Sequence, residues 1–274
     1  GEPKGVMLSH RNLASNYTVI AGMHPVDHKC RALSFLPLCH AYERMMNYHY
    51  QYKGLGVYYI GSLSQILSGL QEIRPHMFNS VPRLLEKVYH GFISKGKELK
   101  GISKLIYHRA ISITRHFEYN RRYPVLLGLK IRLYDRLVYS KWREALGGNI
   151  IYAISGGAAI YPEISRLFGM AGILNLEGYG LTETSPVIAV NHPGKKIMKI
   201  GTVGPILNGI EVKIADDGEI LCRGDNVMMG YYKSPEQTAA VIDDEGWFHT
   251  GDIGTFEDGI FLKITDRKKE MFKL

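Results

Sequence analysis

Two glycines flank a tyrosine in the stretch Leu176-Glu-Gly-Tyr-Gly-Leu-Thr-Glu-Thr-Ser-Pro186. Gly178 and Gly180 leave the backbone bare and free to take positive φ angles. A flat ring can therefore lie against this backbone beside the side chain of Tyr179. This pattern of residues is the one expected at a nucleotide site.

Two hydroxyls flank a carboxylate in the second half of the same stretch. The hydroxyl of Thr182 can donate to a phosphate oxygen, whereas the carboxylate of Glu183 would repel a phosphate unless a divalent cation lay between them. These side chains therefore predict a phosphate site with Mg²⁺ bound by Glu183. The alternative is a polar turn after a buried strand over residues 172–176, with Thr182 as a cap and Glu183 in solvent.

Two further groups of candidate residues follow predicted strands. His40 comes after the apolar stretch Arg31–Leu38, and the turn Gly156-Gly157-Ala158 follows the apolar stretch Asn149–Ile154. Ligand-binding residues of open α/β sheets gather at the carboxyl ends of strands, and a glycine turn lets a ring approach the backbone. The alternatives are a structural histidine and an ordinary strand-to-helix turn.

An aspartate beside a glycine is the last candidate. The carboxylate of Asp252 can accept hydrogen bonds from both hydroxyls of a ribose, provided that it is held in place. Aspartates in Gly-Asp turns are usually turn formers. The residue type alone therefore does not show whether Asp252 binds a ribose or forms a turn.

The order of these motifs resembles the adenylate-forming enzymes, the superfamily of acyl-CoA synthetases, luciferases and peptide-synthetase adenylation domains. A single motif match would be weak support, but four matches in the expected order indicate that the chain is a member of this superfamily. The resemblance covers the whole chain. Details in His40-Ala-Tyr-Glu-Arg44 and Val81-Pro-Arg-Leu-Leu-Glu-Lys-Val88 are similar to the long-chain fatty acid CoA ligases, and the chain resembles the central part of such a ligase. The four matching stretches are Gly1-Glu-Pro-Lys-Gly-Val6, Leu176–Pro186, Gly246-Trp-Phe-His-Thr-Gly-Asp-Ile-Gly254 and Thr265-Asp-Arg-Lys-Lys-Glu270.

The resemblance implies a role for each candidate residue. Lys4 would be the last cation of a phosphate-binding loop, His40 would border the pocket for the acyl carboxylate, and Asp266 would be the hinge residue. Adenine would lie between the turn 156–158 and Tyr179, and Asp252 and Arg267 would contact the ribose. The nucleotide-binding set implied in this way is Lys4, Gly156, Gly157, Ala158, Glu177, Gly178, Tyr179, Gly180, Thr182, Asp252 and Arg267, and the catalytic set is Thr182, Glu183 and His40.

Strands and helices alternate over the first two thirds of the chain. A strand at 56–60, a helix at 64–73 and a strand at 76–81 have βαβ spacing, which predicts a parallel sheet. From Pro193 onward, short alternating strands and glycine turns predict a small β subdomain.

We therefore expect an α/β fold in which parallel sheets are flanked by helices. The expected domains are an α/β part over residues 1–192, a β subdomain over residues 193–265 and a hinge over residues 266–274. The resemblance places a C-terminal lid after this hinge and implies that the chain without the lid is not competent alone.

The positive charge is concentrated in one segment that is expected to be helical. Residues 83–143 contain 15 Lys and Arg against four acidic residues, a local balance of +11 in a chain whose net charge is +8. Apolar residues recur between the charges, so we expect one face to pack and the other to stay charged. The expected helix breaks lie near Gly96, Gly101 and Pro124, and the expected packed face includes Leu105, Ile106, Ile113 and Phe117.

An anionic membrane surface fits this charge better than a nucleic acid, because no nucleic-acid-binding motif surrounds it. Ordinary solvated helices are the alternative. No apolar run approaches the roughly 18 residues of a membrane-spanning helix, and the chain opens with Gly1, so we expect neither a membrane span nor a signal peptide in this sequence. Cys30, Cys39 and Cys222 are few and have apolar neighbours, which predicts buried thiols in a cytoplasmic protein. The basic segment adds the expectation of peripheral association with a membrane.

The resemblance implies ATP-dependent activation of a long-chain fatty acid to acyl-adenylate and then to acyl-CoA, with Mg²⁺ as cofactor and ATP and CoA as co-substrates. One alternative is an adenylate-forming ligase for another carboxylic acid. The other is a non-catalytic nucleotide-binding or lipid-binding module.

Overall fold

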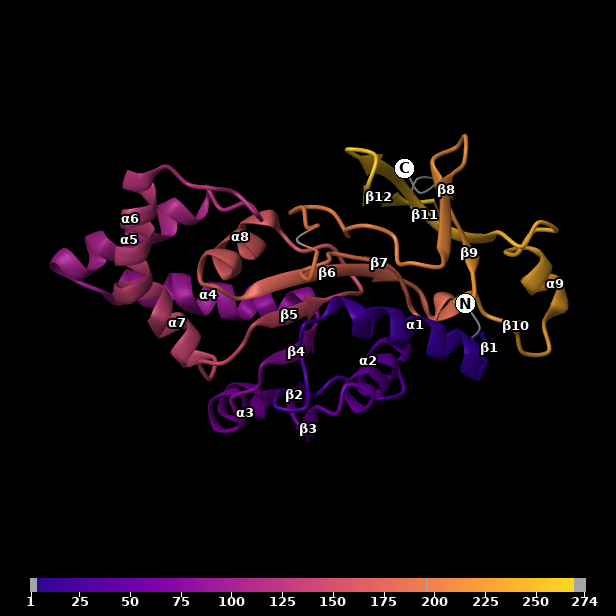
Figure 1. The fold of residues 1–274 in the computed structure, drawn as a ribbon, viewed down its shortest axis with the longest axis horizontal. Coiled ribbons are helices and arrows are strands. Elements are labelled where there is room, and N and C mark those ends of the chain that lie inside the picture. Colours follow the sequence, from indigo (N-terminus) through magenta and orange to yellow (C-terminus); the bar gives the residue numbers. More distant parts are fainter. Residues whose placement is uncertain (1–3, 196, 269–274) are drawn as a thin grey trace. The chain divides into compact units, whose positions relative to one another are not determined.

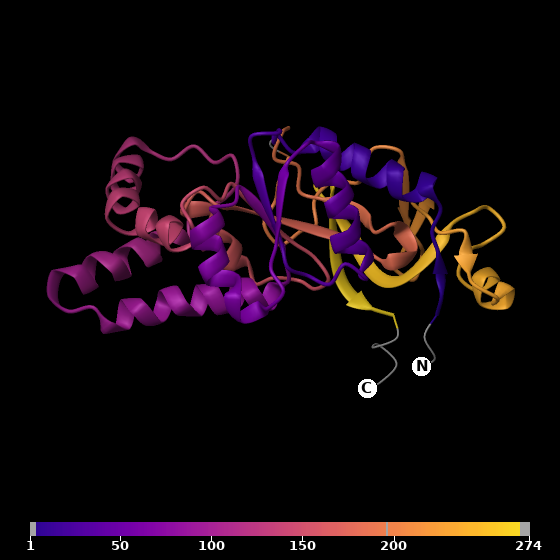
Figure 2. The same cartoon turned by 90° about the horizontal axis from the view of Figure 1, so that it is seen from below.

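The computed structural model describes residues 4–195 and 197–268 (Figures 1 and 2). The motif residues 1–3, 269 and 270, and with them residues 269–274 of the predicted hinge, lie outside the described residues. The chain forms two compact units that interleave along the sequence. Unit 1 comprises residues 1–25, 37–53 and 177–274, and unit 2 comprises residues 26–36 and 54–176. The domain boundaries at residues 192 and 265 stay a prediction.

Unit 2 contains a parallel sheet. Its strands are β2 (Arg31–Ser34), β3 (Gly56–Tyr59), β4 (Met77–Ser80) and β5 (Tyr152–Ser155), in the order β3-β2-β4-β5. Neighbouring strands pair in parallel, as the βαβ spacing predicted. Strands β4 and β5 are buried along their whole length, which explains why neither carries a charged side chain.

The connections of unit 2 are helical, and the breaks expected at Gly101 and Pro124 are confirmed. Gly101 begins a helix with a φ of 56°, and Pro124 precedes the next one. Gly96 instead lies inside a helix, where a Cβ would come within 2.4 Å of the Tyr107 ring, so the break predicted there was wrong. The elements are η1 (Leu63–Gln65), α3 (Ile66–Ile73), α4 (Pro82–Glu98), α5 (Gly101–Thr114), α6 (Val125–Tyr134), the π-helical turn η2 (Asp135–Tyr139), α7 (Ser140–Ala145) and α8 (Pro162–Met170).

Helix α5 packs one narrow stripe against the core of unit 2. It buries Tyr107, Ala110 and Thr114, which follow one another by one helical turn. Leu105 lies off this stripe and is 51% exposed, so the expectation that it packs was wrong. The other members of the predicted packed face do pack against the core: Ile106, Ile113 and Phe117.

Unit 1 begins with two helices that pack on each other, α1 (His10–Met23) and α2 (Ala41–Tyr52). The hydroxyl of Ser9 accepts from the Asn12 amide at 3.1 Å, and the Asn12 side chain accepts from the Ser9 amide at 2.7 Å. These reciprocal hydrogen bonds cap the N-terminus of α1 at Ser9.

Strand β6 (Leu174–Gly180) begins in unit 2 and ends in unit 1, where β7 (Val187–Val190) pairs antiparallel with its second half. The strand was predicted to stop at residue 176, but it continues through both glycines of the central motif. Gly178 and Gly180 are therefore strand residues without positive φ, contrary to the expectation. Gly180 is required for another reason, because a Cβ there would lie 1.7 Å from the Pro186 carbonyl oxygen.

The rest of unit 1 is built on an antiparallel sheet with the order β12-β11-β9-β8. Its strands are β8 (Ile210–Ile214), β9 (Glu219–Gly224), β11 (Phe248–Glu257) and β12 (Phe261–Arg267). Strand β1 (Val6–Met7) pairs with β10 (Gly230–Tyr231), and the short helix α9 (Pro235–Ala239) follows. The predicted α/β fold with an additional β sheet is confirmed.

Two further expectations concern solvent and membrane. None of the helices in the described ranges is long and apolar enough to cross a membrane. Cys222 is buried and Cys30 half-buried, but Cys39 is exposed in the turn before α2, so the prediction of buried thiols was wrong for Cys39.

Candidate nucleotide-binding site

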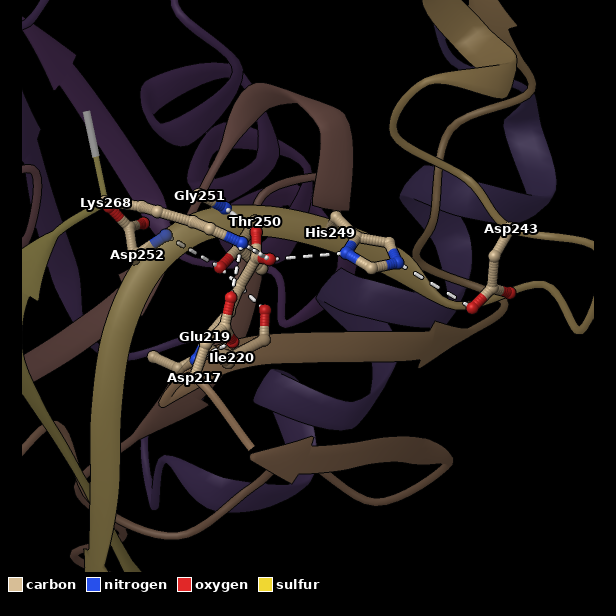
Figure 3. Close-up of polar contacts among 9 residues, drawn as sticks. All are labelled: Asp217, Glu219, Ile220, Asp243, His249, Thr250, Gly251, Asp252 and Lys268. Carbon is tan, nitrogen blue, oxygen red and sulfur yellow. Dashed lines mark hydrogen bonds and ion pairs between the residues drawn. The ribbon is translucent and has the colours of Figure 1, made fainter. Parts of the chain in front are cut away.

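Asp252 lies on β11 next to β9, and only 4% of its surface is exposed (Figure 3). The Asp252 amide donates to Thr250 Oγ1 at 3.1 Å, and the Thr250 hydroxyl donates to the Ile220 carbonyl at 2.8 Å. Gly251, between them, has a φ of 73°, a backbone angle that favours glycine. These contacts fix the position of the carboxylate on the sheet.

Two other predicted site residues contact this carboxylate. The Tyr179 hydroxyl donates to Asp252 Oδ2 at 2.8 Å, and Arg267 Nε lies 3.2 Å from Oδ1. Burial and the charge of Asp252 raise the pKa of Tyr179 well above its ordinary value, so its hydroxyl stays a donor. The structure thus brings Tyr179, Asp252 and Arg267 together from β6, β11 and β12.

Glu219, which was not singled out from the sequence, holds the backbone before Asp252 (Figure 3). Its carboxylate accepts from the Gly251 amide at 2.9 Å and from Lys268 Nζ at 2.7 Å, and His249 Nδ1 lies 3.3 Å away. Lys268 also pairs with Asp217 at 2.6 Å. Burial raises the pKa of Glu219, but the hydrogen bonds from Lys268 and Gly251 outweigh burial and leave this pKa below its ordinary value. The charged carboxylate is therefore an anchor for the Gly251 turn.

A second cluster joins Lys4 and Glu183 through Tyr231. The Tyr231 hydroxyl donates to Glu183 Oε1 at 2.9 Å, and Lys4 Nζ lies 4.5 Å from the centre of the Tyr231 ring. The pairing of β1 with β10 sets Val6 opposite Tyr231, which explains why Lys4 reaches this ring. Burial and the hydrogen bond to Glu183 raise the pKa of Tyr231, so the tyrosine is neutral between a cation and a carboxylate.

The 3-10 turn η3 (Thr182–Thr184) exposes one threonine and buries another. The Thr184 hydroxyl accepts from the Leu181 amide at 3.0 Å and donates to the Pro186 carbonyl at 2.5 Å, so Thr184 braces the turn. The side chain of Thr182 is exposed and has no such contact within the described part of the chain. Its hydroxyl is therefore available to a ligand.

Glu177 and Gly178 lie in the middle of β6. Glu177 is 7% exposed, and its carbonyl accepts from the Asn191 amide at 3.1 Å. A Cβ on Gly178 would meet Ala189 and Val190 at 3.4 to 3.5 Å, which is ordinary contact. Packing alone therefore does not require glycine at 178, in contrast to 180.

His40 is the residue before α2, and its side chain is exposed without capping the helix. Its backbone amide donates to the Pro37 carbonyl at 3.0 Å. Among the described residues, the structure brings no other predicted site residue into hydrogen-bond contact with the His40 ring. The role of His40 toward a carboxylate stays a prediction.

The turn Gly156-Gly157-Ala158 follows β5 in unit 2. The Gly156 amide lies 3.4 Å from the Ser80 carbonyl, and Gly157 has a φ of 84°. A Cβ on Gly157 would meet open space, so its positive φ is the reason for glycine there. The position of adenine between this turn and Tyr179 stays a prediction.

Glu183 fits Mg²⁺ as one ligand of a shared site. Within residues 4–195 and 197–268, no group of three or more His, Cys, Asp and Glu side chains is arranged to hold a metal ion. Mg²⁺ usually binds one or two carboxylates together with phosphate oxygens and water. The hydrogen bond from Tyr231 engages Glu183 Oε1, so Oε2 remains for such an ion. The residues present therefore fit Mg²⁺ that is bound together with a phosphate.

Residues 1–232 match the protein family described as AMP-binding enzyme. The chain belongs to this family. The long chain acyl-CoA synthetase 6, peroxisomal, of Arabidopsis thaliana is 37% identical over 292 residues, which cover 100% of this chain and 40% of the relative. The long-chain-fatty-acid–CoA ligase FadD15 of Mycobacterium tuberculosis is 37% identical over 276 residues, which cover 99% of the chain and 45% of the relative. The chain therefore spans less than half the length of these two relatives.

Solved structures share the fold of this chain. The N-terminal domain of FACL13 from Mycobacterium tuberculosis matches with a TM-score of 0.70 at 22% identity, over 97% of this chain and 58% of that one. The o-succinylbenzoate CoA synthetase of Bacillus subtilis, in complex with its acyl-adenylate intermediate, has a TM-score of 0.70 at 22% identity, over 98% of this chain and 47% of that one. At this identity the likeness shows the fold alone.

Proposed function

We propose that the chain carries the nucleotide-binding residues of an ATP-dependent ligase that converts a long-chain fatty acid to acyl-adenylate and pyrophosphate, and then to acyl-CoA. The observation that carries this proposal is the buried Asp252 carboxylate, held by Tyr179 and Arg267. The names of the curated relatives support the long acyl chain and the CoA thioester. ATP, fatty acid and CoA are thus the proposed partners, and no nucleic acid is among them.

In this proposal Asp252 binds the ribose. A carboxylate oxygen has about two acceptor sites, so each oxygen of Asp252 keeps one after its contact with Tyr179 or Arg267. The Arg267 side chain is 65% exposed and has further N–H donors for a ribose oxygen. Because the carboxylate is already fixed, its bonds to two hydroxyls cost little side-chain entropy.

The phosphates are assigned to Lys4, Thr182 and Glu183. The exposed Thr182 hydroxyl donates to a phosphate oxygen, and the Lys4 amine supplies a positive charge. Tyr231 holds the Glu183 carboxylate in position for the ion. When bound, Mg²⁺ offsets the negative charge of the phosphates.

The remaining site residues take the adenine and the acid. Adenine is assigned to the turn Gly156-Gly157-Ala158 and the Tyr179 ring, with the backbone of residues 177–180 beside it. His40 is assigned to the acyl carboxylate. Its place at the N-terminus of α2, a helix of 12 residues, supports this role, because the partial positive charge of a helix N-terminus favours an anion.

We also propose a cytoplasmic enzyme that associates peripherally with anionic membranes through α5 and α6. Large apolar side chains are exposed on both helices, with Ile102 at 77%, Leu126 at 76% and Leu129 at 55%. Each basic residue near an anionic surface adds about 1 kcal/mol, and the apolar side chains can enter the headgroup region. Exposed basic residues flank them: Lys100, Lys104, Arg121, Arg122, Lys130 and Arg132.

Vesicle co-sedimentation of the whole protein tests this association. We expect binding to vesicles that contain phosphatidylserine at low salt, weak binding to pure phosphatidylcholine vesicles, and a loss of binding when Leu126 and Leu129 are both replaced by glutamine. Equal binding of this variant and the wild type would refute a role for α6.

The assignment of Asp252 is tested by calorimetric titration of AMP into the whole protein. We expect Asp252→Asn to weaken AMP binding about ten- to a hundredfold, the effect of losing one or two charge-assisted hydrogen bonds. Asp217→Asn, which neutralises an exposed carboxylate of the same region, is the matched control and should bind AMP normally. The Asp252→Asn variant should also lose the preference for AMP over its 2′,3′-dideoxy analogue. If that preference is unchanged, Asp252 does not contact the ribose.

A further inference from the structure

A cavity of about 400 Å³ lies among α4, α5, η2 and α7, entirely within unit 2. Its volume is in the range of small-molecule sites, and none of its lining residues belongs to the nucleotide site described above. The lining residues are mostly apolar: Phe92, Lys95, Leu99, Ser103, Ile106, Tyr107, Leu137, Val138, Lys141, Trp142 and Ala145.

The floor of the cavity is aromatic, and its polar atoms are already paired. The rings of Phe92 and Trp142 stack with centroids 5.1 Å apart and planes 9° apart. Trp142 Nε1 donates to the Tyr107 hydroxyl at 2.9 Å, which itself donates to the Phe92 carbonyl at 2.6 Å. The floor therefore presents a hydrocarbon surface to a ligand, and its paired polar atoms need no hydrogen bonds from that ligand.

The rim of the cavity is cationic. Lys95 of α4 and Lys141 of α7 are exposed lining residues, whereas no acidic side chain lines the cavity. Within the described part of the chain, neither lysine forms an ion pair. The two amines therefore keep their charge available for an anion at the entrance of an apolar space.

These features select one chemical class of ligand. A metal ion would need carboxylate, imidazole or thiolate ligands, and the lining contains none of these side chains. A nucleotide base would need several convergent donors and acceptors, whereas the lining side chains that could serve it are the Ser103 hydroxyl and the two lysine amines, all of them exposed. A neutral apolar molecule would leave the two lysines without a role. An apolar chain with an anionic end satisfies both the floor and the rim.

We propose that this cavity binds a free fatty acid, with the hydrocarbon chain on Phe92, Tyr107 and Trp142 and the carboxylate between Lys95 and Lys141. The site belongs to α4–α7 and does not rest on the proposed ligase activity, since binding alone is measured. If the basic segment 83–143 were only a set of ordinary solvated helices, no such binding would be expected.

Calorimetric titration of fatty acids into the whole protein, below their micelle concentrations, tests the site. Each added buried methylene should tighten binding about fourfold until the chain fills the cavity. The double variant Lys95→Met, Lys141→Met keeps the length of both side chains and removes both charges. We expect it to weaken decanoate binding at least tenfold while leaving decanol binding unchanged.

Matched variants separate the cavity from the general charge of the segment. Lys97→Met, Lys104→Met removes two exposed charges that do not line the cavity, so decanoate should bind as in the wild type. Ala145→Phe fills the cavity from a half-buried position and should abolish binding of both decanoate and decanol at this site. Ser103→Trp does the same from the exposed rim and covers the case in which Ala145→Phe does not fold.

Photolabelling locates the bound chain and distinguishes it from any other acyl site. A fatty acid with a photoreactive diazirine in its chain should label peptides that contain Phe92, Ile106 or Leu137, and Ala145→Phe should remove this label. Competition by decanoate but not by a lysophospholipid identifies a free carboxylate rather than a phosphate headgroup as the preferred anion. Labelling confined to peptides outside α4–α7, or decanoate affinity unchanged in the double lysine variant, would overturn the proposal.

Discussion

Replacing Glu219 by alanine removes the carboxylate that fixes the turn before Asp252. In the wild type this carboxylate is 4% exposed and accepts from the Gly251 amide and from Lys268. In Glu219→Ala the Gly251 amide loses its acceptor, and Lys268 keeps only Asp217, which is itself 52% exposed.

The expected cost follows from these contacts. A buried amide without an acceptor costs about 1–3 kcal/mol, and a hydrogen bond to a charged group contributes about 1.5–3 kcal/mol. Lys268 is 37% exposed, so solvent recovers part of the second contribution. We therefore expect Glu219→Ala to lower the free energy of unfolding by about 3 kcal/mol. Asp217→Asn should cost at most about 1 kcal/mol, because its carboxylate is largely in solvent.

Urea unfolding of the whole protein measures both variants, with a midpoint shift at constant slope as the readout. Hydrogen exchange of the Gly251 amide gives the local effect, which should be faster in Glu219→Ala and restored in part by Glu219→Gln, since glutamine keeps an acceptor. Equal midpoints for Glu219→Ala and Asp217→Asn, with unchanged exchange at Gly251, would refute the role of Glu219 as an anchor.

Two other predictions concern unit 1. Burial lowers the pKa of His24 to about 3 and of His49 to about 4, so the unfolded chain binds protons more readily than the folded one. The free energy of unfolding should therefore be highest above about pH 6.5 and should fall as the pH drops below it, by about 2 kcal/mol per histidine between pH 7 and pH 5. His49→Leu should reduce this loss, as measured by urea unfolding at each pH. A urea midpoint that does not change with pH would contradict the burial of neutral histidine rings. Gly180→Ala should lower the free energy of unfolding by about 3 kcal/mol or more, because its Cβ would overlap the Pro186 carbonyl. Gly178→Ala should cost about 1 kcal/mol or less, and urea unfolding measures both variants.

Local patterns predicted the parts of the fold that local physics determines. The βαβ order and the helix breaks at Gly101 and Pro124 each depend on residues close together in the sequence, and they are confirmed. Gly96 was misinterpreted because its function depends on a distant residue, the Tyr107 ring, which fills the space where a Cβ would be. A glycine in a helical pattern indicates a helix break only where no neighbouring side chain already excludes a Cβ at that position.

The candidate site shows the same limit. Tyr179, Asp252 and Arg267 were found through motifs, and the structure brings them into contact. Glu219 was missed because an acidic residue at the start of an alternating strand predicts a solvent-facing side chain, whereas β9 is buried on both faces at this point. The available signal was a lone carboxylate beside Ile220, Leu221 and Cys222, and its partner Lys268 is 49 residues away.

ATP–pyrophosphate exchange by the whole protein that contains this chain tests the proposed function most directly. The assay compares palmitate with acetate, benzoate and an amino acid, with and without Mg²⁺. We expect Mg²⁺-dependent exchange that is fastest with palmitate and lost in Glu183→Ala, while the thermal unfolding temperature of that variant stays near the wild type. Exchange with palmitate that survives in Glu183→Ala, or exchange supported only by one of the other acids, would contradict it.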